Sequence, residues 1–129
     1  MSTASATMTA ALQQLAIAND APRKEGPALG SWRWTVRQRM ASVRDALLEE
    51  NGDATGADGW LAARGGAAFR ERNALLGRLG ELGAQVLEES DVAAVRAQVA
   101  RLVVDVSHHV QRVNDLAYDE VEIELGGSE

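Results

Sequence analysis

The sequence predicts an all-α protein, an elongated antiparallel bundle of three main helices with a short fourth helix at the N-terminus. Two observations lead to this prediction. Apolar residues recur at steps of three and four over long segments, and the breaks between these segments are rich in Gly, Pro, Asn and Asp. The core of this 129-residue chain would be alanine and aliphatic, with 4% aromatic residues, which is thin for a monomer and favours a homodimer.

Residues 1–30 are interpreted as an N-terminal arm and linker that precede a helical bundle domain at residues 31–129. Apolar residues at helical spacing predict a short amphipathic helix over about residues 6–18. These apolar residues are Met8, Ala11, Leu12 and Leu15. Two prolines and two glycines between residues 22 and 30 then interrupt the helix.

The first main helix is expected from Ser31, a good N-cap residue, to about Glu50, since Asn51 and Gly52 form a stop signal. Its apolar stripe follows steps of four, four, three and four residues. The stripe consists of Trp32, Val36, Met40, Val43 and Leu47. A loop over residues 51–59 follows, with Asp58 as the next N-cap.

The second main helix is expected from about Gly59 to Glu89. Its apolar seam consists of Leu61, Ala68, Leu75, Leu79, Leu82 and Val86. Five interior glycines each cost roughly 1 kcal/mol relative to alanine in a helix. They are Gly65, Gly66, Gly77, Gly80 and Gly83. We interpret them as sites where a neighbouring helix or a large side chain approaches closely, and a ligand against the bare backbone is the alternative.

The third main helix is expected to begin at an N-cap, Ser90 or Asp91, and to continue to about Leu125. Its seam is a heptad pattern. The seam consists of Val99, Val103, Val106, Val110, Val113 and Ala117. At 1.5 Å per residue the second and third helices would be roughly 45 and 52 Å long, so they form an elongated hairpin that the first helix covers only in part.

Composition and charge exclude several classes of function. The chain has no cysteine, so it forms no disulfide and offers no thiolate for metal binding or nucleophilic catalysis. A net charge of −6 opposes binding to nucleic acid, which requires a basic surface. The sequence contains no export signal and no apolar run of about 20 residues, so we expect a cytoplasmic protein without a membrane partner.

A polar belt is predicted halfway along the bundle. If short turns set the register, Glu71 lies level with His108, and Arg37 lies level with Arg72. The belt then comprises Arg37, Glu71, Arg72, Asn73, Asp105, His108, His109 and Arg112. Five of these residues form the candidate ligand-binding set, namely Arg37, Glu71, His108, His109 and Arg112.

The belt has three interpretations. A metal site is rejected because the sequence has no Glu-x-x-His motif, and His108 and His109 diverge by about 100° on a helix. Acid–base catalysis would need a histidine oriented by Glu71 or Asp105, and no accompanying pocket or oxyanion donor is identified. The third interpretation is purely structural: a half-buried His109 is hydrogen-bonded to Glu71 or Asp105 and acts as a structural pin that holds the helices together.

Two surfaces are candidates for binding a partner protein. The C-terminal end is acidic, since Arg112 is the only arginine or lysine between Asp105 and Glu129. Acidic residues in the last turns of a helix interact unfavourably with the negative end of the helix dipole. A basic partner that binds there would offset this cost. The candidate residues are Tyr118, Asp119 and Glu122 at this end, and Trp34, Arg33 and Arg37 near the start of the first main helix. Trp and Arg are enriched among residues that dominate binding energy.

The sequence therefore predicts a non-enzymatic adaptor or regulator that acts through protein–protein contacts, without catalytic residues, metal or cofactor. The alternative is a bundle that binds a small molecule, or an enzyme, through the polar belt. A regulator associated with nucleic acid is the third hypothesis, and the net charge opposes it.

Overall fold

A computed structural model describes residues 3–21, 27–49 and 59–127, with side chains described at residues 6–21, 28–49 and 66–116. These ranges contain four helices and no strand. The helices are α1 (Thr3–Asp20), α2 (Pro27–Glu49), α3 (Gly59–Glu88) and α4 (Val92–Gly127). The all-α prediction is therefore confirmed, and the helices of the described ranges number four.

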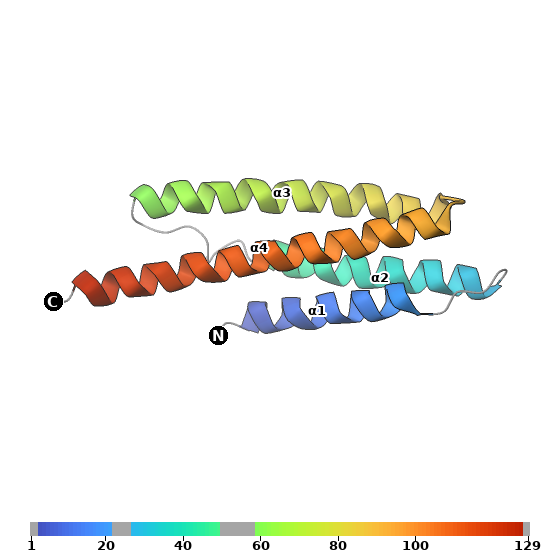
Figure 1. The fold of residues 1–129 in the computed structure, drawn as a ribbon, viewed down its shortest axis with the longest axis horizontal. Coiled ribbons are helices and arrows are strands. Elements are labelled where there is room, and N and C mark those ends of the chain that lie inside the picture. Colours follow the sequence, from blue (N-terminus) through green and yellow to red (C-terminus); the bar gives the residue numbers. More distant parts are fainter. Residues whose placement is uncertain (1–2, 22–26, 50–58, 128–129) are drawn as a thin grey trace.

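The four helices lie along one common axis, and consecutive helices run in opposite directions (Figure 1). α1 packs mainly on α2 and α4, and α3 packs mainly on α4 and α2. The first turns of α3 and the last turns of α4 extend beyond α1 and α2 (Figure 1). None of the helices within the described ranges has the length and apolar composition needed to cross a membrane.

The N-terminal segment contributes a helix of 18 residues to the fold, longer than the short helix expected at residues 6–18. Its apolar stripe is buried against the other helices. The buried residues are Met8, Ala11, Leu12, Leu15 and Ala18. α1 therefore supplies part of the same hydrophobic core as α2, α3 and α4.

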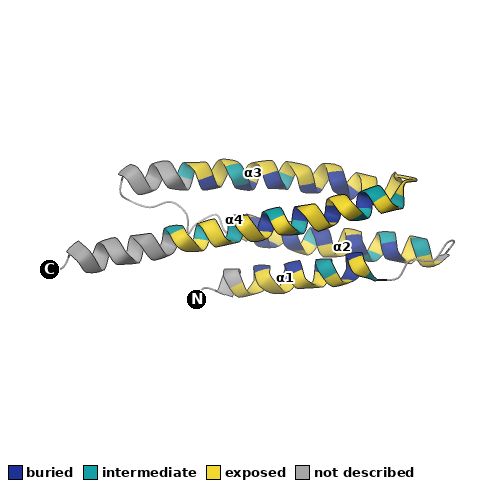
Figure 2. Cartoon of the chain, viewed as in Figure 1, coloured by how far each residue is buried: buried dark blue, intermediate teal, exposed yellow. Residues whose placement is uncertain are grey.

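α2 begins at Pro27, four residues before the expected N-cap at Ser31. Proline is favoured at the first position of a helix because its missing N–H would have no partner there. The predicted stripe of α2 is buried in full, as expected, and faces the centre of the bundle (Figure 2). The glycine at position 30 lies inside the helix and has no atom within 4 Å of an added Cβ.

The turn between α3 and α4 is close to its prediction. Asp91 is the N-cap of α4, because the backbone N–H of Ala94 donates a hydrogen bond to Asp91 Oδ1 at 3.1 Å. Across this turn Glu71 contacts His109, one residue from the expected His108. A short turn fixes the register of the two helices that it joins, so this register follows from the sequence.

The predicted register between α2 and α3 is wrong. Arg37 was expected level with Arg72, but its side chain lies 3.1 Å from the Cβ position of Gly83. Eleven residues separate positions 72 and 83, which is roughly 16 Å along a helix. The connection between α2 and α3 is long and does not impose a register, so packing of the apolar stripes determines it instead.

The inward face of α4 is rotated relative to the predicted seam. The buried stripe consists of Val95, Val99, Leu102, Val106 and His109. Val103 and Val110 are only partly buried and pack at the side of the core. α4 packs on both α1 and α3, so its apolar face is wider than a heptad seam, which has two apolar positions in each repeat. This rotation places His109 in the core.

The interior glycines of α3 do not all mark a close approach. An added Cβ at Gly77 or Gly80 would have no atom within 4 Å. At Gly83 the same Cβ would lie 3.1 Å from Arg37 Nε. The interpretation of close approach therefore holds at Gly83 and is wrong at Gly77 and Gly80.

Side chains from neighbouring helices cap two helix C-termini. Arg96 of α4 donates from Nε to the backbone oxygen of Asn19 and from Nη2 to that of Asp20, both at 2.9 Å. Trp32 Nε1 donates to the same Asn19 oxygen at 3.3 Å. Arg33 of α2 donates to the backbone oxygens at the end of α3. Cations are favourable at the negative end of a helix dipole. These contacts therefore cap the helix ends and also hold neighbouring helices together.

Candidate functional site

An arginine-rich edge runs along the bundle where α2 and α3 meet. Its positions step by three or four residues along each helix, so each set shares one face. We define the arginine edge as Arg33, Arg37, Ala41, Arg44 and Leu48 on α2, with Phe69, Arg72, Leu76, Gly80, Gly83 and Leu87 on α3. It contains four arginines and no Asp or Glu, although the chain has a net charge of −6. Charge is therefore segregated on this molecule.

Trp34 stands exposed at one end of the arginine edge, with 61% of its surface accessible. The neighbouring Arg33 donates from Nη1 to Val86 O at 2.7 Å and from Nη2 to Glu89 O at 2.8 Å. These contacts fix the start of α2 against the end of α3, where Leu87 is also exposed. We call the exposed residues near this junction, Trp34 and Arg37 on α2 and Leu87 on α3, the Trp34 patch.

The predicted partner-binding residues of α2 differ in their surroundings. Arg33 is half-buried, and both its terminal nitrogens are engaged with α3. Trp34 and Arg37 are exposed. Within the described ranges Arg37 forms no ion pair, and its side chain crosses Gly83. Trp34 and Arg37 are therefore accessible to a partner, whereas Arg33 positions the surface that carries them.

The structure brings three belt residues together, one on α3 and two on α4. Glu71 Oε1 lies 2.5 Å from His109 Nδ1. Arg112 donates from Nε to Glu71 Oε1 at 3.1 Å and from Nη2 to Glu71 Oε2 at 2.7 Å. The carboxylate therefore binds a buried imidazole on one side and a guanidinium fork on the other, a strong type of ion pair.

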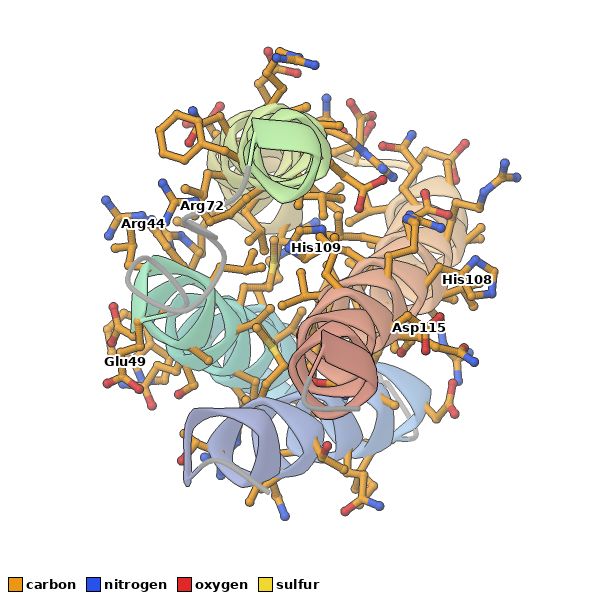
Figure 3. The ribbon with its side chains drawn as sticks, turned by 90° about the vertical axis from the view of Figure 1, so that its left-hand side faces the viewer. Arg44, Glu49, Arg72, His108, His109 and Asp115 are labelled. Carbon is orange, nitrogen blue, oxygen red and sulfur yellow. The ribbon has the colours of Figure 1, made fainter. Side chains whose placement is uncertain are left out.

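The electrostatics of this cluster favour an ionised Glu71. Burial raises the pKa of Glu71, but hydrogen bonds from Arg112 and His109 and the charges of both outweigh burial, so the pKa lies below its usual 4.5. His109 is fully buried and points into the bundle (Figure 3). Glu71 is thus held charged between its two partners, which matches the interpretation of a structural pin.

The remaining belt residues lie apart from Glu71. Arg37 is adjacent to Gly83, so the predicted height of Arg37 is wrong. His108 points outward into solvent on α4 (Figure 3). Asp105 pairs with Arg78 of α3 at 2.8 Å. The five-residue ligand set is therefore reduced to three residues, His109 and Arg112 each in contact with Glu71.

One further belt residue, Arg72, belongs to the arginine edge. Arg72 is buried, and its guanidinium carbon lies 4.6 Å from the centroid of the Phe69 ring. It also donates to the Oδ1 atom of Asn73 at 3.5 Å. Viewed along the bundle, Arg72 and Arg44 lie on the side where α2 and α3 meet (Figure 3). The arginine stacked on Phe69 restrains an aromatic ring that remains exposed.

A groove of about 290 Å³ opens beside the Glu71 cluster between α3 and α4. Its described lining consists of Ala67, Ala68, Glu71, Arg112, Asp115 and Leu116. Glu71 and Arg112 are paired with each other in its wall. The groove therefore offers a mainly apolar lining with one carboxylate, Asp115, that is exposed to solvent.

The predicted contact residues at the acidic end lie outside the described side chains. Tyr118, Asp119 and Glu122 fall within α4, whose backbone is helical to Gly127. The basic partner expected at this end therefore remains a prediction. Figure 1 shows that the end of α4 extends beyond α1 and α2.

Sequence reasoning missed most of the arginine edge. Arg44, Leu48 and Phe69 were assigned no binding role, although all three are exposed there. The available signal was the spacing of Arg33, Arg37 and Arg44 on one face of α2 without an intervening acid. The correct register of α2 and α3 was also needed to join this face to Phe69.

Within the described residues, no group of three or more His, Asp or Glu side chains is placed to hold a metal ion. Comparison of the chain with family models, with curated proteins and with solved structures gave no match. Its function is therefore inferred from the surfaces of this molecule alone.

Proposed function

We propose that this protein is a non-enzymatic adaptor or regulator that binds another protein through the Trp34 patch. The observation that carries the proposal is the exposure of Trp34, one turn from Arg37 on α2, where Arg33 fixes α2 against the end of α3 that carries the exposed Leu87. Tryptophan and arginine are the side chains that most often dominate binding energy. Tryptophan is highly buried on average in folded proteins, so an exposure of 61% sets Trp34 apart.

The chemistry of the patch defines the kind of partner. Trp34 and Leu87 offer apolar area, and Arg37 forms no ion pair within the described ranges. A partner that fits would place an apolar side chain against Trp34 and a carboxylate against Arg37. Because Arg33 already orders the start of α2, binding would not have to order that backbone.

The test is capture of the partner from the lysate of the source cells by the tagged, full-length chain. One stoichiometric protein should bind the wild type and be lost with Trp34→Ala. Ile17→Ala is the matched control, since Ile17 of α1 is 65% exposed and lies on another helix. A protein that binds both variants equally would contradict the role of the patch, and the absence of any bound protein would contradict the adaptor function.

A small-molecule-binding bundle is the second candidate, because the groove of about 290 Å³ adjoins Glu71 and Arg112. Its volume is at the small end of ligand sites, and the apolar Ala67, Ala68 and Leu116 line it. Glu71 is engaged by Arg112 and His109, so the exposed Asp115 is the group that would contact a ligand. The ligand would then be a small amine with a positive charge and an apolar body. Thermal stabilisation by such amines that disappears with Asp115→Asn would support this candidate.

A further inference from the structure

We propose that the protein forms a two-fold homodimer in which the acidic end of α4 of each copy docks on the arginine edge of the other, at Arg44, Leu48 and Phe69. This inference goes beyond the adaptor function and uses a different surface. Leu87 and Phe69 are 18 residues apart on α3, roughly 27 Å along the helix, so the Trp34 patch stays outside the docked segment.

The receiving surface combines apolar area with unneutralised positive charge. Leu48 and Phe69 are among the large apolar side chains that remain exposed. Arg44 is exposed on the same face of α2, one helical turn before Leu48, and forms no ion pair within the described ranges. An exposed apolar surface bordered by arginines is typical of an interaction site rather than of a solvated face.

The occupant is indicated by charge complementarity within the same chain. Residues 113–127 contain five acids and no lysine or arginine. The part of the arginine edge where the segment docks contains Arg44 and Arg72 and no acid. The acidic segment also contains apolar residues for contact with Leu48 and Phe69. These apolar residues are Val113, Leu116, Val121, Ile123 and Leu125. The edge and the acidic segment are therefore surfaces of opposite charge on the same chain.

The helix directions permit this arrangement without a change in the bundle. The end of α4 extends beyond α1 and α2, and α4 runs parallel to α2 (Figure 1). A two-fold axis that brings the extended ends together sets the α4 of the partner copy antiparallel to α2. The negative C-terminal pole of that helix then approaches the arginines of the edge, which is the favourable polarity. By symmetry both contacts form at once.

The test measures the dimer dissociation constant of the full-length protein by sedimentation equilibrium. The edge variant carries Arg44→Glu and Leu48→Glu. Its matched control carries Arg39→Glu and Val104→Glu, since both positions are exposed on other faces of α2 and α4. The tip variant carries Asp119→Asn, Glu120→Gln, Glu122→Gln and Glu124→Gln. Thermal unfolding monitored by circular dichroism establishes that each variant is folded.

We expect a dimer at low salt that dissociates as the salt concentration rises, because salt screens charge pairs that remain partly exposed. The edge and tip variants should each raise the dissociation constant by about tenfold or more, since two symmetric contacts are lost. The control variant should remain within about twofold of the wild type. A monomeric wild type, or a dimer that neither variant weakens, would overturn the proposal.

A mixing experiment tests the reciprocal contact itself. An edge variant has two damaged contacts in its own homodimer, and so does a tip variant. A heterodimer of the two has one intact contact, formed by the edge of the tip variant and the tip of the edge variant. The mixture should therefore associate more tightly than either variant alone. Association no tighter than that of the separate variants would refute the assignment of the two surfaces.

Discussion

Replacement of Glu71 by alanine tests whether the polar cluster is a structural pin. The Glu71 carboxylate accepts a hydrogen bond from the buried His109 and two from Arg112. Glu71→Ala removes the only described carboxylate that touches this imidazole, whose side chain is 1% exposed. Water has little access to replace it, so the cost of desolvating the imidazole is no longer offset.

The magnitude follows from the burial of the two partners. Loss of an acceptor for a buried polar group costs about 1–3 kcal/mol. The pair with Arg112 adds less, about 0.2–1 kcal/mol, because the Arg112 side chain is 56% exposed and solvent screens it. Alanine returns a few tenths of a kcal/mol through its helix propensity. We therefore expect a loss of about 2 kcal/mol and a decrease in Tm of roughly 6–12 °C.

Urea unfolding monitored by far-UV circular dichroism measures this loss. The control is Glu81→Ala, an exposed glutamate of the same helix without a hydrogen bond or ion pair within the described ranges, which should change stability by less than about 0.5 kcal/mol. Arg112→Ala should cost less than Glu71→Ala. If Glu71→Ala destabilises the protein no more than Glu81→Ala does, the polar cluster is not a structural pin.

Three further predictions concern stability. Glu71 has a folded pKa below 4.5, so its contribution is complete above pH 4.5 and is lost as the pH falls through the folded value; the stability difference between wild type and Glu71→Gln should shrink in acid urea titrations. Gly80→Ala should stabilise the protein by about 0.5–1 kcal/mol in the same assay, because nothing obstructs the added Cβ, and Gly83→Ala should gain less. Arg96→Ala should cost about 1–2 kcal/mol and increase amide exchange at the end of α1, because the Asp20 oxygen loses this donor and the Asn19 oxygen keeps only the one from Trp32.

Local signals in the sequence predicted the helices well. The stripe of α2 is buried as expected, and Asp91 caps α4 as expected. These features depend on residues within a few positions of one another, where spacing and capping chemistry act directly. The contact between Glu71 and His109 was also accessible, because a short turn transmits register from α3 to α4.

Features that depend on packing between distant segments were harder to predict. The position of Arg37 against Gly83 depends on how the stripes of α2 and α3 interlock, and the connection between them gives no constraint. The rotation of α4 that buries His109 depends on α1 as well as α3, since both helices cover its apolar face. A pattern of apolar residues defines a face, but the neighbours of that face determine which residue lies at its centre.

The affinity of the captured partner for three versions of the full-length chain measures how much Trp34 contributes to binding. Isothermal titration calorimetry would compare the wild type with Trp34→Ala and with the exposed control Ile17→Ala. Loss of an interface tryptophan that dominates binding costs about 2 kcal/mol or more, so Trp34→Ala should weaken binding by about 30-fold or more, whereas Ile17→Ala should stay within about twofold. Equal affinities for the wild type and Trp34→Ala would contradict the account.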